Sequence, residues 1–201
     1  VVIANHSHVI DPLLVSASFR RIVNWVSKIE NYYTPFFRTF LQIGGSIPIR
    51  RGQSDTNALR LMRETIENNR VLGIFPEGTR TRTGYINRFH TGAARMCLEY
   101  NIPYIPVGIE GTYKLKVGDH IKIRIGKPVY PHGKPATFEN AKALTTRMKD
   151  DILKLSNGTP ATEELLKVAR SSDVIIPKGD SMFDQIVRSQ MIAASKIHKE
   201  I

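Results

Sequence analysis

The sequence predicts an α/β fold with a largely parallel central sheet flanked by helices, followed by a helical C-terminal segment. Over about residues 1–133, short apolar runs of strand type alternate with stretches of helical character. Such alternation is typical of a parallel sheet covered by helices. Beyond about residue 134 the pattern becomes helical. We therefore expect a single domain over residues 1–201, with an α/β core at about 1–133 and a helical part at about 134–201.

Six short runs have the character of strands. They are expected at Val1–Ala4, Arg21–Ile29, Ser46–Ile49, Val71–Phe75, Tyr104–Ile109 and Ile121–Ile125. The fourth run is apolar and is stopped by Pro76, while Gly44-Gly45 and Arg50-Arg51 bound the third. In open α/β sheets, ligands bind at the carboxyl ends of the strands. The loops that follow these runs are therefore the first places to look for a site.

Helices are expected between and after these strands. Asp11 is predicted to be the N-cap of a helix through about Phe19, with Pro12 in its first turn. Ser54 or Asp55 is expected to cap a helix in which Leu59, Met62 and Ile66 share one face. Further helices are expected at Pro35–Leu41, at Thr91–Tyr100, along the apolar stripe from Ala141 to Leu155, from near Thr162, and from about Asp180 to Lys199.

Charge and composition narrow the classes of partner. The chain has a net charge of +11, from 29 Lys and Arg against 18 Asp and Glu. This excess favours anionic partners, and nucleic acid, anionic lipid headgroups and phosphorylated small molecules all qualify. Cys97 is the single cysteine, which excludes a disulfide within the chain. No apolar run approaches the ~18–20 residues that a membrane-spanning helix needs, and no signal peptide is visible.

A histidine and an aspartate form the first candidate site. The loop Asn5–Asp11 follows the first expected strand, and a tight turn can fold Asp11 back onto the ring of His6. A carboxylate bonded to one ring nitrogen fixes the tautomer, so that the other nitrogen can take a proton from a hydroxyl. The alternatives are that Asp11 only caps the helix, or that His8 takes the catalytic role. A nucleophilic Ser7 is disfavoured, because the chain has no G-x-S-x-G elbow.

The second candidate site is the hexapeptide Phe75–Arg80. Gly78 lets the backbone approach a ligand closely, Thr79 offers a hydroxyl, and Arg80 offers a planar fork that suits phosphate oxygens. Glu77 could orient an arginine or bond a ligand hydroxyl. Arg82 and Arg88, and a second basic loop at Arg50-Arg51, add positive charge. One arginine alone would suggest a solvated polar turn, but two basic loops after two strands favour an anion site.

Four blocks of sequence together resemble the glycerolipid acyltransferase family, whose best-known members are the 1-acylglycerol-3-phosphate acyltransferases. The blocks are Asn5-His6-Ser7-His8-Val9-Ile10-Asp11, Gly45-Ser46-Ile47-Pro48-Ile49-Arg50-Arg51, Phe75-Pro76-Glu77-Gly78-Thr79-Arg80 and Ile105-Pro106-Val107-Gly108-Ile109. The resemblance covers roughly residues 1–112. Four blocks in one order are far more specific than any one of them.

The resemblance implies roles for the matching residues. His6 is similar to the general base that activates the acceptor hydroxyl, and Asp11 to its partner. Arg51 and Arg80 resemble the residues that hold the acceptor phosphate, and Arg50 lies beside the first of them. The remaining matches are acceptor-site positions at Glu77, Gly78 and Thr79, and a wall near the acyl or thioester group at Pro106.

The resemblance also implies the chemistry and its cofactors. The acyl donor is acyl-CoA or acyl-carrier protein, with no metal, no other cofactor and no acyl-enzyme intermediate. One departure concerns phosphate specificity: many members have a Phe-Lys-x-Gly segment, whereas this chain reads Phe89-His90-Thr91-Gly92. One positive contact is therefore lost, or is replaced by Arg88.

The implied function is transfer of a fatty-acyl group to the free sn-2 hydroxyl of 1-acylglycerol 3-phosphate, giving phosphatidic acid. Glycerol 3-phosphate or a lysophospholipid is the alternative acceptor, and a non-catalytic lipid-binding protein is the alternative class. Nucleic acid is not expected as a partner, because no recognition motif is present.

We expect a membrane-associated protein at the cytoplasmic face, and a lysophosphatidic acid-type lipid and an anionic membrane surface as partners. The segment Asp180–Lys199 could rest on that surface or pack on its own domain.

Overall fold

The computed structural model describes residues 1–33, 35–50 and 55–162 of the chain. Two compact units share these residues. Of the described residues, the first unit contains 1–20 and 73–162, and the second contains 21–33, 35–50 and 55–72. Each unit is described by itself below.

The sheet of the first unit has the order β4-β1-β5-β6. Strand β1 (Val2–Ala4) lies parallel to β4 (Val71–Ile74) on one side and to β5 (Ile105–Glu110) on the other. Strand β6 (Lys122–Ile125) pairs antiparallel with β5 at the edge. All three residues of β1 are buried, as expected for a central strand covered on both faces. The predicted largely parallel sheet is confirmed.

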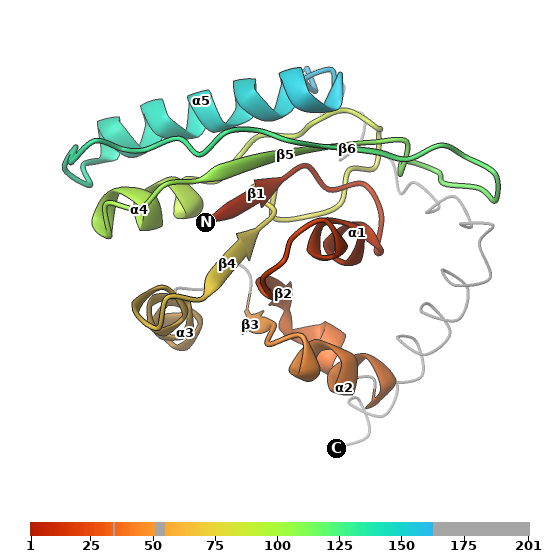
Figure 1. The fold of residues 1–201 in the computed structure, drawn as a ribbon, viewed down its shortest axis with the longest axis horizontal. Coiled ribbons are helices and arrows are strands. Elements are labelled where there is room, and N and C mark those ends of the chain that lie inside the picture. The colour runs from red at the N-terminus through yellow and green to blue at the C-terminus, as the bar shows by residue number, and fades with distance from the viewer. Residues whose placement is uncertain (34, 51–54, 163–201) are drawn as a thin grey trace. The chain divides into compact units, whose positions relative to one another are not determined.

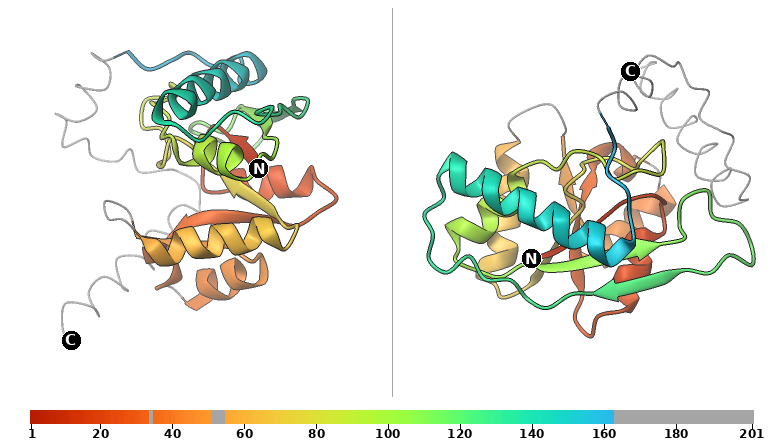
Figure 2. Two further views of the ribbon diagram at one scale, coloured as in Figure 1. Left: turned by 90° about the vertical axis from the view of Figure 1, so that its left-hand side faces the viewer. Right: turned by 90° about the horizontal axis from the view of Figure 1, so that it is seen from above.

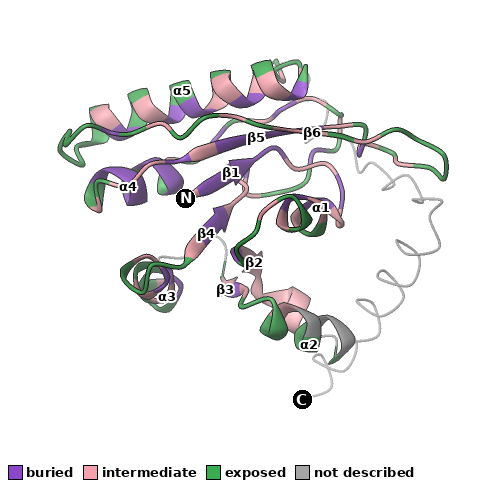
Figure 3. Ribbon diagram, viewed as in Figure 1, coloured by how far each residue is buried: buried purple, intermediate pink, exposed green. Residues whose placement is uncertain are grey.

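Three of the described helices belong to this unit, namely α1 (Asp11–Ala17), α4 (Gly92–Glu99) and α5 (Phe138–Ser156). Helix α5 runs along β5 and also packs on α4 (Figures 1 and 2). Its inner residues are buried and its outer face is exposed (Figure 3). The close approach of α5 to β5 requires Gly108, because a Cβ there would lie 2.3 Å from the carbonyl carbon of Leu155.

The core of this unit lies between the sheet and these helices. It contains Ile3, Ile86, Phe89, Ala93, Ala94, Cys97, Tyr104, Met148 and Ile152. Tyr104 is fully buried and donates a hydrogen bond of 2.6 Å from its hydroxyl to Oδ2 of Asp151 on α5. This bond satisfies the only polar atom of a large core side chain and ties the helix to the start of β5.

The second unit contains a parallel pair of strands, β2 (Val23–Lys28) and β3 (Ile47–Ile49). The 3-10 helix η1 (Ile29–Tyr32) and helix α2 (Pro35–Ile43) connect them. Helix α3 (Thr56–Glu67) packs on β3 and is capped by Asp55, whose carboxylate accepts the N–H of Ala58 at 2.9 Å.

Two details of the expected helices are wrong. Asp11 is not an N-cap: Ile10 occupies that position, and Asp11 is the first helical residue because its carboxylate binds N–H groups upstream in the loop. In α3 the buried residues are Ala58, Met62 and Thr65, while Leu59 is partly exposed at 39%. The face is therefore rotated by about one residue from the predicted one.

Part of the predicted helical C-terminal segment lies outside the described residues. The helical part begins with α5, which confirms the stripe through Ala141, Met148 and Ile152. The helices expected from near Thr162 and at Asp180–Lys199 lie outside the described residues, and the single-domain organisation stays a prediction. Among the described helices, none is both long and apolar enough to cross a bilayer.

Candidate functional site

The carboxylate of Asp11 organises the loop that follows β1. Its Oδ2 atom lies 2.9 Å from Nδ1 of His6 and accepts the backbone N–H groups of Ser7 and His8, each at 2.7 Å. Asp11 is fully buried. Two N–H donors and a ring nitrogen therefore converge on one oxygen, which holds the loop in a tight turn and fixes the direction of the His6 ring. The contact between residues 6 and 11 that the spacing predicted is present.

His8, the other candidate base, is placed differently. It is buried, and its Nδ1 faces the backbone N–H of Ile10 at 3.4 Å, within its own loop. His6, by contrast, stacks its ring on that of Phe75, with centroids 4.0 Å apart and an interplanar angle of 16°. Its side chain keeps 16% of its surface exposed. The geometry favours His6 over His8 as the group that meets a substrate.

The backbone of His6 is held from two sides by the loop after β4. Its N–H donates to Oε1 of Glu77 at 2.9 Å, and its carbonyl accepts the N–H of Thr81 at 2.8 Å. The two loops that sequence analysis singled out are therefore joined directly. This juxtaposition follows from the parallel pairing of β1 with β4, since parallel strands end at the same edge of a sheet.

Glu77 is a buried carboxylate with bonds from two segments. Its second oxygen, Oε2, accepts the N–H of Asn87 at 2.8 Å, and the residue is only 4% exposed. Burial raises the pKa of Glu77 to about 7, while the N–H groups of Asn87 and His6 and the charge of Lys149 act in the opposite direction. The side chain thus stabilises the loop itself, and its predicted contact with an acceptor stays a prediction.

The rest of the hexapeptide forms a tight turn. Gly78 has a φ of +70° and donates its N–H to the carbonyl of Phe75 at 3.0 Å. A Cβ at this position would also lie 3.1 Å from the His90 ring, so glycine is required for two reasons. Thr79 and Arg80 follow with exposed side chains.

A cleft of about 960 Å³ opens beside this turn. We call it the basic cleft, because six basic side chains line it: Arg80, Arg82, Arg88, His90, Lys142 and Lys149. The first four belong to the loop after β4, where sequence analysis placed positive charge. Lys142 and Lys149 come from α5, and a surface lysine on a helix gives no sequence signal that could have identified them. His90, which replaces the lysine of the family pattern, and Arg88 both line the cleft.

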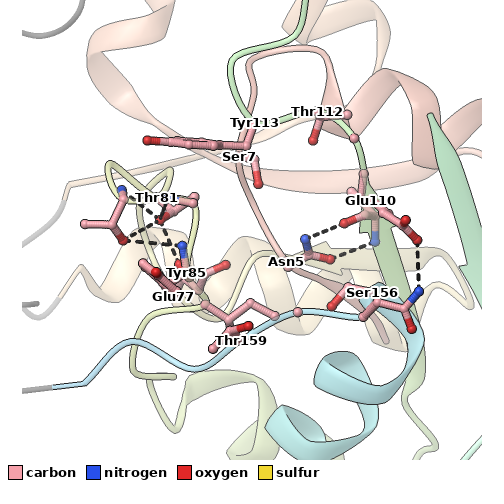
Figure 4. A pocket seen from close by; sticks show the side chains of 17 residues that line it. Asn5, Ser7, Glu77, Thr81, Tyr85, Glu110, Thr112, Tyr113, Ser156 and Thr159 are labelled. Carbon is pink, nitrogen blue, oxygen red and sulfur yellow. Dashed lines mark hydrogen bonds between the residues drawn. The ribbon is translucent and has the colours of Figure 1, made fainter. Parts of the chain in front are cut away.

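A second cavity of about 280 Å³, the polar cavity, lies by the same loop (Figure 4). Asn5, Ser7 and Glu77 line it, together with residues from the segments 81–86, 109–113 and 156–159. Sequence analysis included Asn5 in the first block but predicted no contact for its side chain. Its side chain donates from Nδ2 to the carbonyl of Ile109 and accepts the N–H of Ile109 at Oδ1, both at 2.8 Å. The amide thus continues the pairing of β1 with β5 by one residue.

The remaining predicted site residues are Pro106, Arg50 and Arg51. His6 is among the lining residues of neither cavity. Pro106 is buried in β5 and lines neither of them, and its carbonyl accepts the N–H of Gly126 at 2.8 Å. Arg50 belongs to the second unit, where its N–H donates to Oδ2 of Asp55 at 2.8 Å. Arg51 lies outside the described residues.

No group of three or more His, Cys, Asp and Glu side chains within the described ranges is arranged to hold a metal ion. Cys97 is buried, and burial raises the pKa of its thiol to about 11, which keeps it protonated at neutral pH. At the loop after β1, the structure brings the imidazole of His6 into contact with the carboxylate of Asp11.

Comparison with known proteins places this site in a family. A 1-acyl-sn-glycerol-3-phosphate acyltransferase of Borreliella burgdorferi is 28% identical over 167 residues, which are 77% of this chain and 64% of the relative. The enzyme of that name from Saccharomyces cerevisiae is 23% identical over 215 residues, covering 100% of this chain and 71% of the relative.

A solved structure is also similar. The crystal structure of the 1-acyl-sn-glycerophosphate acyltransferase of Thermotoga maritima matches with a TM-score of 0.59 and 25% identity, over 78% of this chain and 64% of that one. The chain thus spans less than two thirds of the length of the Borreliella and Thermotoga proteins. The sequence model described as "Acyltransferase" matches residues 1–110, which is more than half of the chain. This match includes both strand-end loops, and the chain belongs to the acyltransferase family.

Proposed function

We propose that the protein transfers a fatty-acyl group from acyl-CoA or acyl-carrier protein to the free sn-2 hydroxyl of 1-acylglycerol 3-phosphate, giving phosphatidic acid. Membership of the acyltransferase family supports the reaction class, and the names of the relatives support the acceptor. The observation that carries the proposal is the contact of 2.9 Å between Nδ1 of His6 and Oδ2 of Asp11. This contact prepares one imidazole as a base.

In the proposed mechanism, His6 is the general base. A neutral ring that donates from Nδ1 to Asp11 has its lone pair on Nε2. The acceptor oxygen attacks the thioester carbonyl carbon while its proton moves to Nε2. The tetrahedral intermediate then collapses, the C–S bond breaks, and the imidazolium returns the proton to the thiolate. Asp11 stabilises the imidazolium that forms between the two steps.

The acceptor is proposed to bind through its phosphate. Arg80 and Arg51 are the guanidinium groups assigned to this task, since two planar donors suit phosphate oxygens. Arg50, Glu77, Gly78 and Thr79 are proposed to complete the acceptor site, and Pro106 to lie near the acyl group. The donor is a substrate, and the mechanism needs no metal and no other cofactor.

We further propose that the reaction takes place at an anionic membrane surface, on its cytoplasmic face. The lipid nature of the proposed acceptor and the net charge of +11 support this location. Binding to liposomes of neutral and of anionic lipid, at low and high salt, tests it. Equal binding to both kinds of liposome would contradict an electrostatic attraction.

The experiment that tests the function offers labelled acyl-CoA or acyl-carrier protein with a panel of acceptors. The panel contains 1-acylglycerol 3-phosphate, glycerol 3-phosphate and a lysophospholipid, and each product is identified by mass. Phosphatidic acid as the main product is expected. A preference for glycerol 3-phosphate or the lysophospholipid would contradict the proposed acceptor, and absence of any transfer would contradict the proposed activity.

A further inference from the structure

The basic cleft has more positive charge than the proposed acceptor needs. Five Arg and Lys side chains and His90 line it, and Glu77 is the single acidic residue among the lining residues. We propose that the cleft binds the phosphorylated nucleotide end of a CoA-type acyl donor, with Lys142 and Lys149 of α5 as phosphate ligands. The inference rests on the proposed function, because it assumes that a thioester donor is used.

The cleft is long in the direction of α5. Glu77, whose carboxylate bonds the backbone of His6, lines the cleft together with Lys149 of α5. Lys142 lies seven residues earlier on the helix and Phe138 eleven residues earlier. At 1.5 Å per residue these positions lie about 10 Å and about 16 Å further along α5. A ligand with several phosphates and a base fills such a length better than one phosphomonoester does.

The positive charges of the cleft make no ion pairs within the part of the chain that the structure describes. Among the described residues, no ion pair joins an acidic side chain to Arg80, Arg82, Arg88, Lys142 or Lys149. Cations gathered in a concave surface attract a polyanion strongly, since the field of each adds to that of the others. The side chain of Phe138, 61% exposed at the end of the cleft, offers an apolar face on which a base can stack.

The position of His6 distinguishes the donor from the acceptor. In 1-acylglycerol 3-phosphate the phosphate and the reacting hydroxyl sit on neighbouring carbons, so its phosphate must lie close to the base. In a CoA-type donor a long pantetheine arm separates the thioester from the phosphates. His6 does not line the basic cleft, although Glu77, which binds its backbone, does. Arg80, the residue proposed for the acceptor phosphate, also lines the cleft, so only the lysines of α5 are assigned to the ligand whose phosphates lie far from the reacting carbon.

The two lysines also allow a clean test. They lie beyond residue 110, outside the part of the chain that the family model matches, and neither is assigned to the acceptor. Lys154 is a matched control, because it is an exposed lysine of the same helix that lines neither cavity. Calorimetry with CoA and with adenosine 3′,5′-bisphosphate measures binding without turnover. The variants are Lys142→Ala with Lys149→Ala, Lys142→Gln alone, and Lys154→Ala.

We expect the double variant to weaken CoA binding about tenfold or more, as loss of two charge-assisted contacts should. Binding of the bisphosphate should weaken by a similar factor. Lys142→Gln should give a smaller loss of affinity, and Lys154→Ala should leave the affinities for CoA and the bisphosphate unchanged. Because Lys142 is exposed, its glutamine variant keeps the test valid if the double variant unfolds. Equal CoA affinity in Lys142→Gln, Lys154→Ala and the unaltered protein would overturn the proposal.

Competition and kinetics separate the other occupants. The inference is overturned if glycerol 3-phosphate displaces CoA from the cleft, or if holo-acyl-carrier protein, and not CoA, loses affinity in the lysine variants. In turnover assays the double variant should raise the KM for acyl-CoA and leave the KM for the acceptor within about twofold. If CoA binding depends on the lysines but no acyl transfer occurs, the proposed function is refuted and the nucleotide site stands. If acyl transfer occurs but donor binding does not depend on the lysines, the nucleotide site is refuted and the proposed function stands.

Discussion

The backbone N–H of His6 donates to Oε1 of Glu77 at 2.9 Å, across 71 positions of the sequence. The other oxygen of the same carboxylate accepts the N–H of Asn87 at 2.8 Å. One buried side chain therefore joins the loop after β1, the loop after β4 and the segment before α4. The position of the proposed base thus depends on a carboxylate whose two oxygens are both occupied by backbone donors.

Glu77→Gln should lower both turnover and stability. An amide has a single acceptor oxygen, so its NH₂ group would face one of the two N–H donors, and an unsatisfied buried N–H costs about 1–3 kcal/mol. We expect urea unfolding to show a loss of that size, and kcat to fall more than the KM for the acceptor rises. A rise in acceptor KM with unchanged kcat would instead indicate direct contact with the acceptor. Glu139→Gln on the exposed side of α5 is the control, with an expected change within about 0.5 kcal/mol.

The raised pKa of Glu77 also predicts how stability depends on pH. Burial raises this pKa to about 7 from the ordinary value of 4.5, so between these values the folded protein binds a proton that the unfolded chain releases. Stability rises with pH only where the unfolded state binds more protons, so this contribution falls as pH rises from about 4.5 to about 7. At about 1.36 kcal/mol per pKa unit, the fall is about 3 kcal/mol.

Urea unfolding of the unaltered protein and of Glu77→Gln at pH 5, 6, 7 and 8 isolates this contribution. The stability difference between the two should change by most of that amount between pH 5 and 8. Parallel pH profiles would show that Glu77 keeps the same pKa when the chain unfolds.

His6→Ala should abolish most of the turnover and spare the fold. A positioned general base supplies ~10²–10⁴-fold, and without the ring Asp11 still accepts the backbone N–H groups of Ser7 and His8 that hold the loop. Acyl transfer at saturating donor and acceptor is the measurement, with circular dichroism to check folding. His120→Ala, at an exposed histidine that lines neither cavity, is the control. More than about a tenth of the original rate in His6→Ala would contradict the role of base.

The strands and the histidine–aspartate pair could be predicted because both depend on short-range patterns. Apolar runs identified β1, β4 and β5, and a spacing of five residues brought His6 and Asp11 into hydrogen-bond reach. The N-cap prediction for Asp11 failed for a physical reason. Its carboxylate can accept hydrogen bonds from either side. In the folded loop it accepts the backbone N–H groups of Ser7 and His8, which precede it, rather than N–H groups of the helix.

Contacts across long sequence separations could not be predicted. The bidentate bond of Asn5 to Ile109 spans 104 residues and depends on the register of β1 with β5. Lys142 and Lys149 become part of the basic cleft only because α5 packs on β5, which places one helix face beside the loop after β4. The lysines do not differ in local sequence from ordinary surface residues, and the place of Asn5 in the first sequence block does not reveal its partner on β5.

Arg80→Ala should chiefly weaken binding of the acceptor. A guanidinium bonded to a phosphate contributes about 1.5–3 kcal/mol, so the KM for 1-acylglycerol 3-phosphate should rise roughly 10- to 100-fold. Arg80→Lys keeps the charge and loses the fork, and it should give an intermediate value. The assay varies the concentration of the acceptor at a saturating concentration of the donor. The double variant Lys142→Ala with Lys149→Ala is measured in the same assay for comparison. An unchanged dependence on acceptor concentration would exclude Arg80 from the phosphate site.

Gly108→Ala tests the contact that sets α5 against β5. The new Cβ would lie 2.3 Å from the carbonyl carbon of Leu155 and 2.4 Å from the backbone nitrogen of Ser156, at the end of α5. Backbone cannot rotate away as a side chain can, so the end of the helix must shift, at a cost of about 1–3 kcal/mol or more.

Gly92→Ala is the matched control, because a Cβ there meets nothing within 4 Å and the residue is the first of helix α4. Urea unfolding should show a gain of about 0.4–1 kcal/mol for the control and a loss for Gly108→Ala. Equal stabilities would mean that α5 does not approach β5 as closely as the structure shows, and the place of Lys142 and Lys149 in the basic cleft would then lose its support.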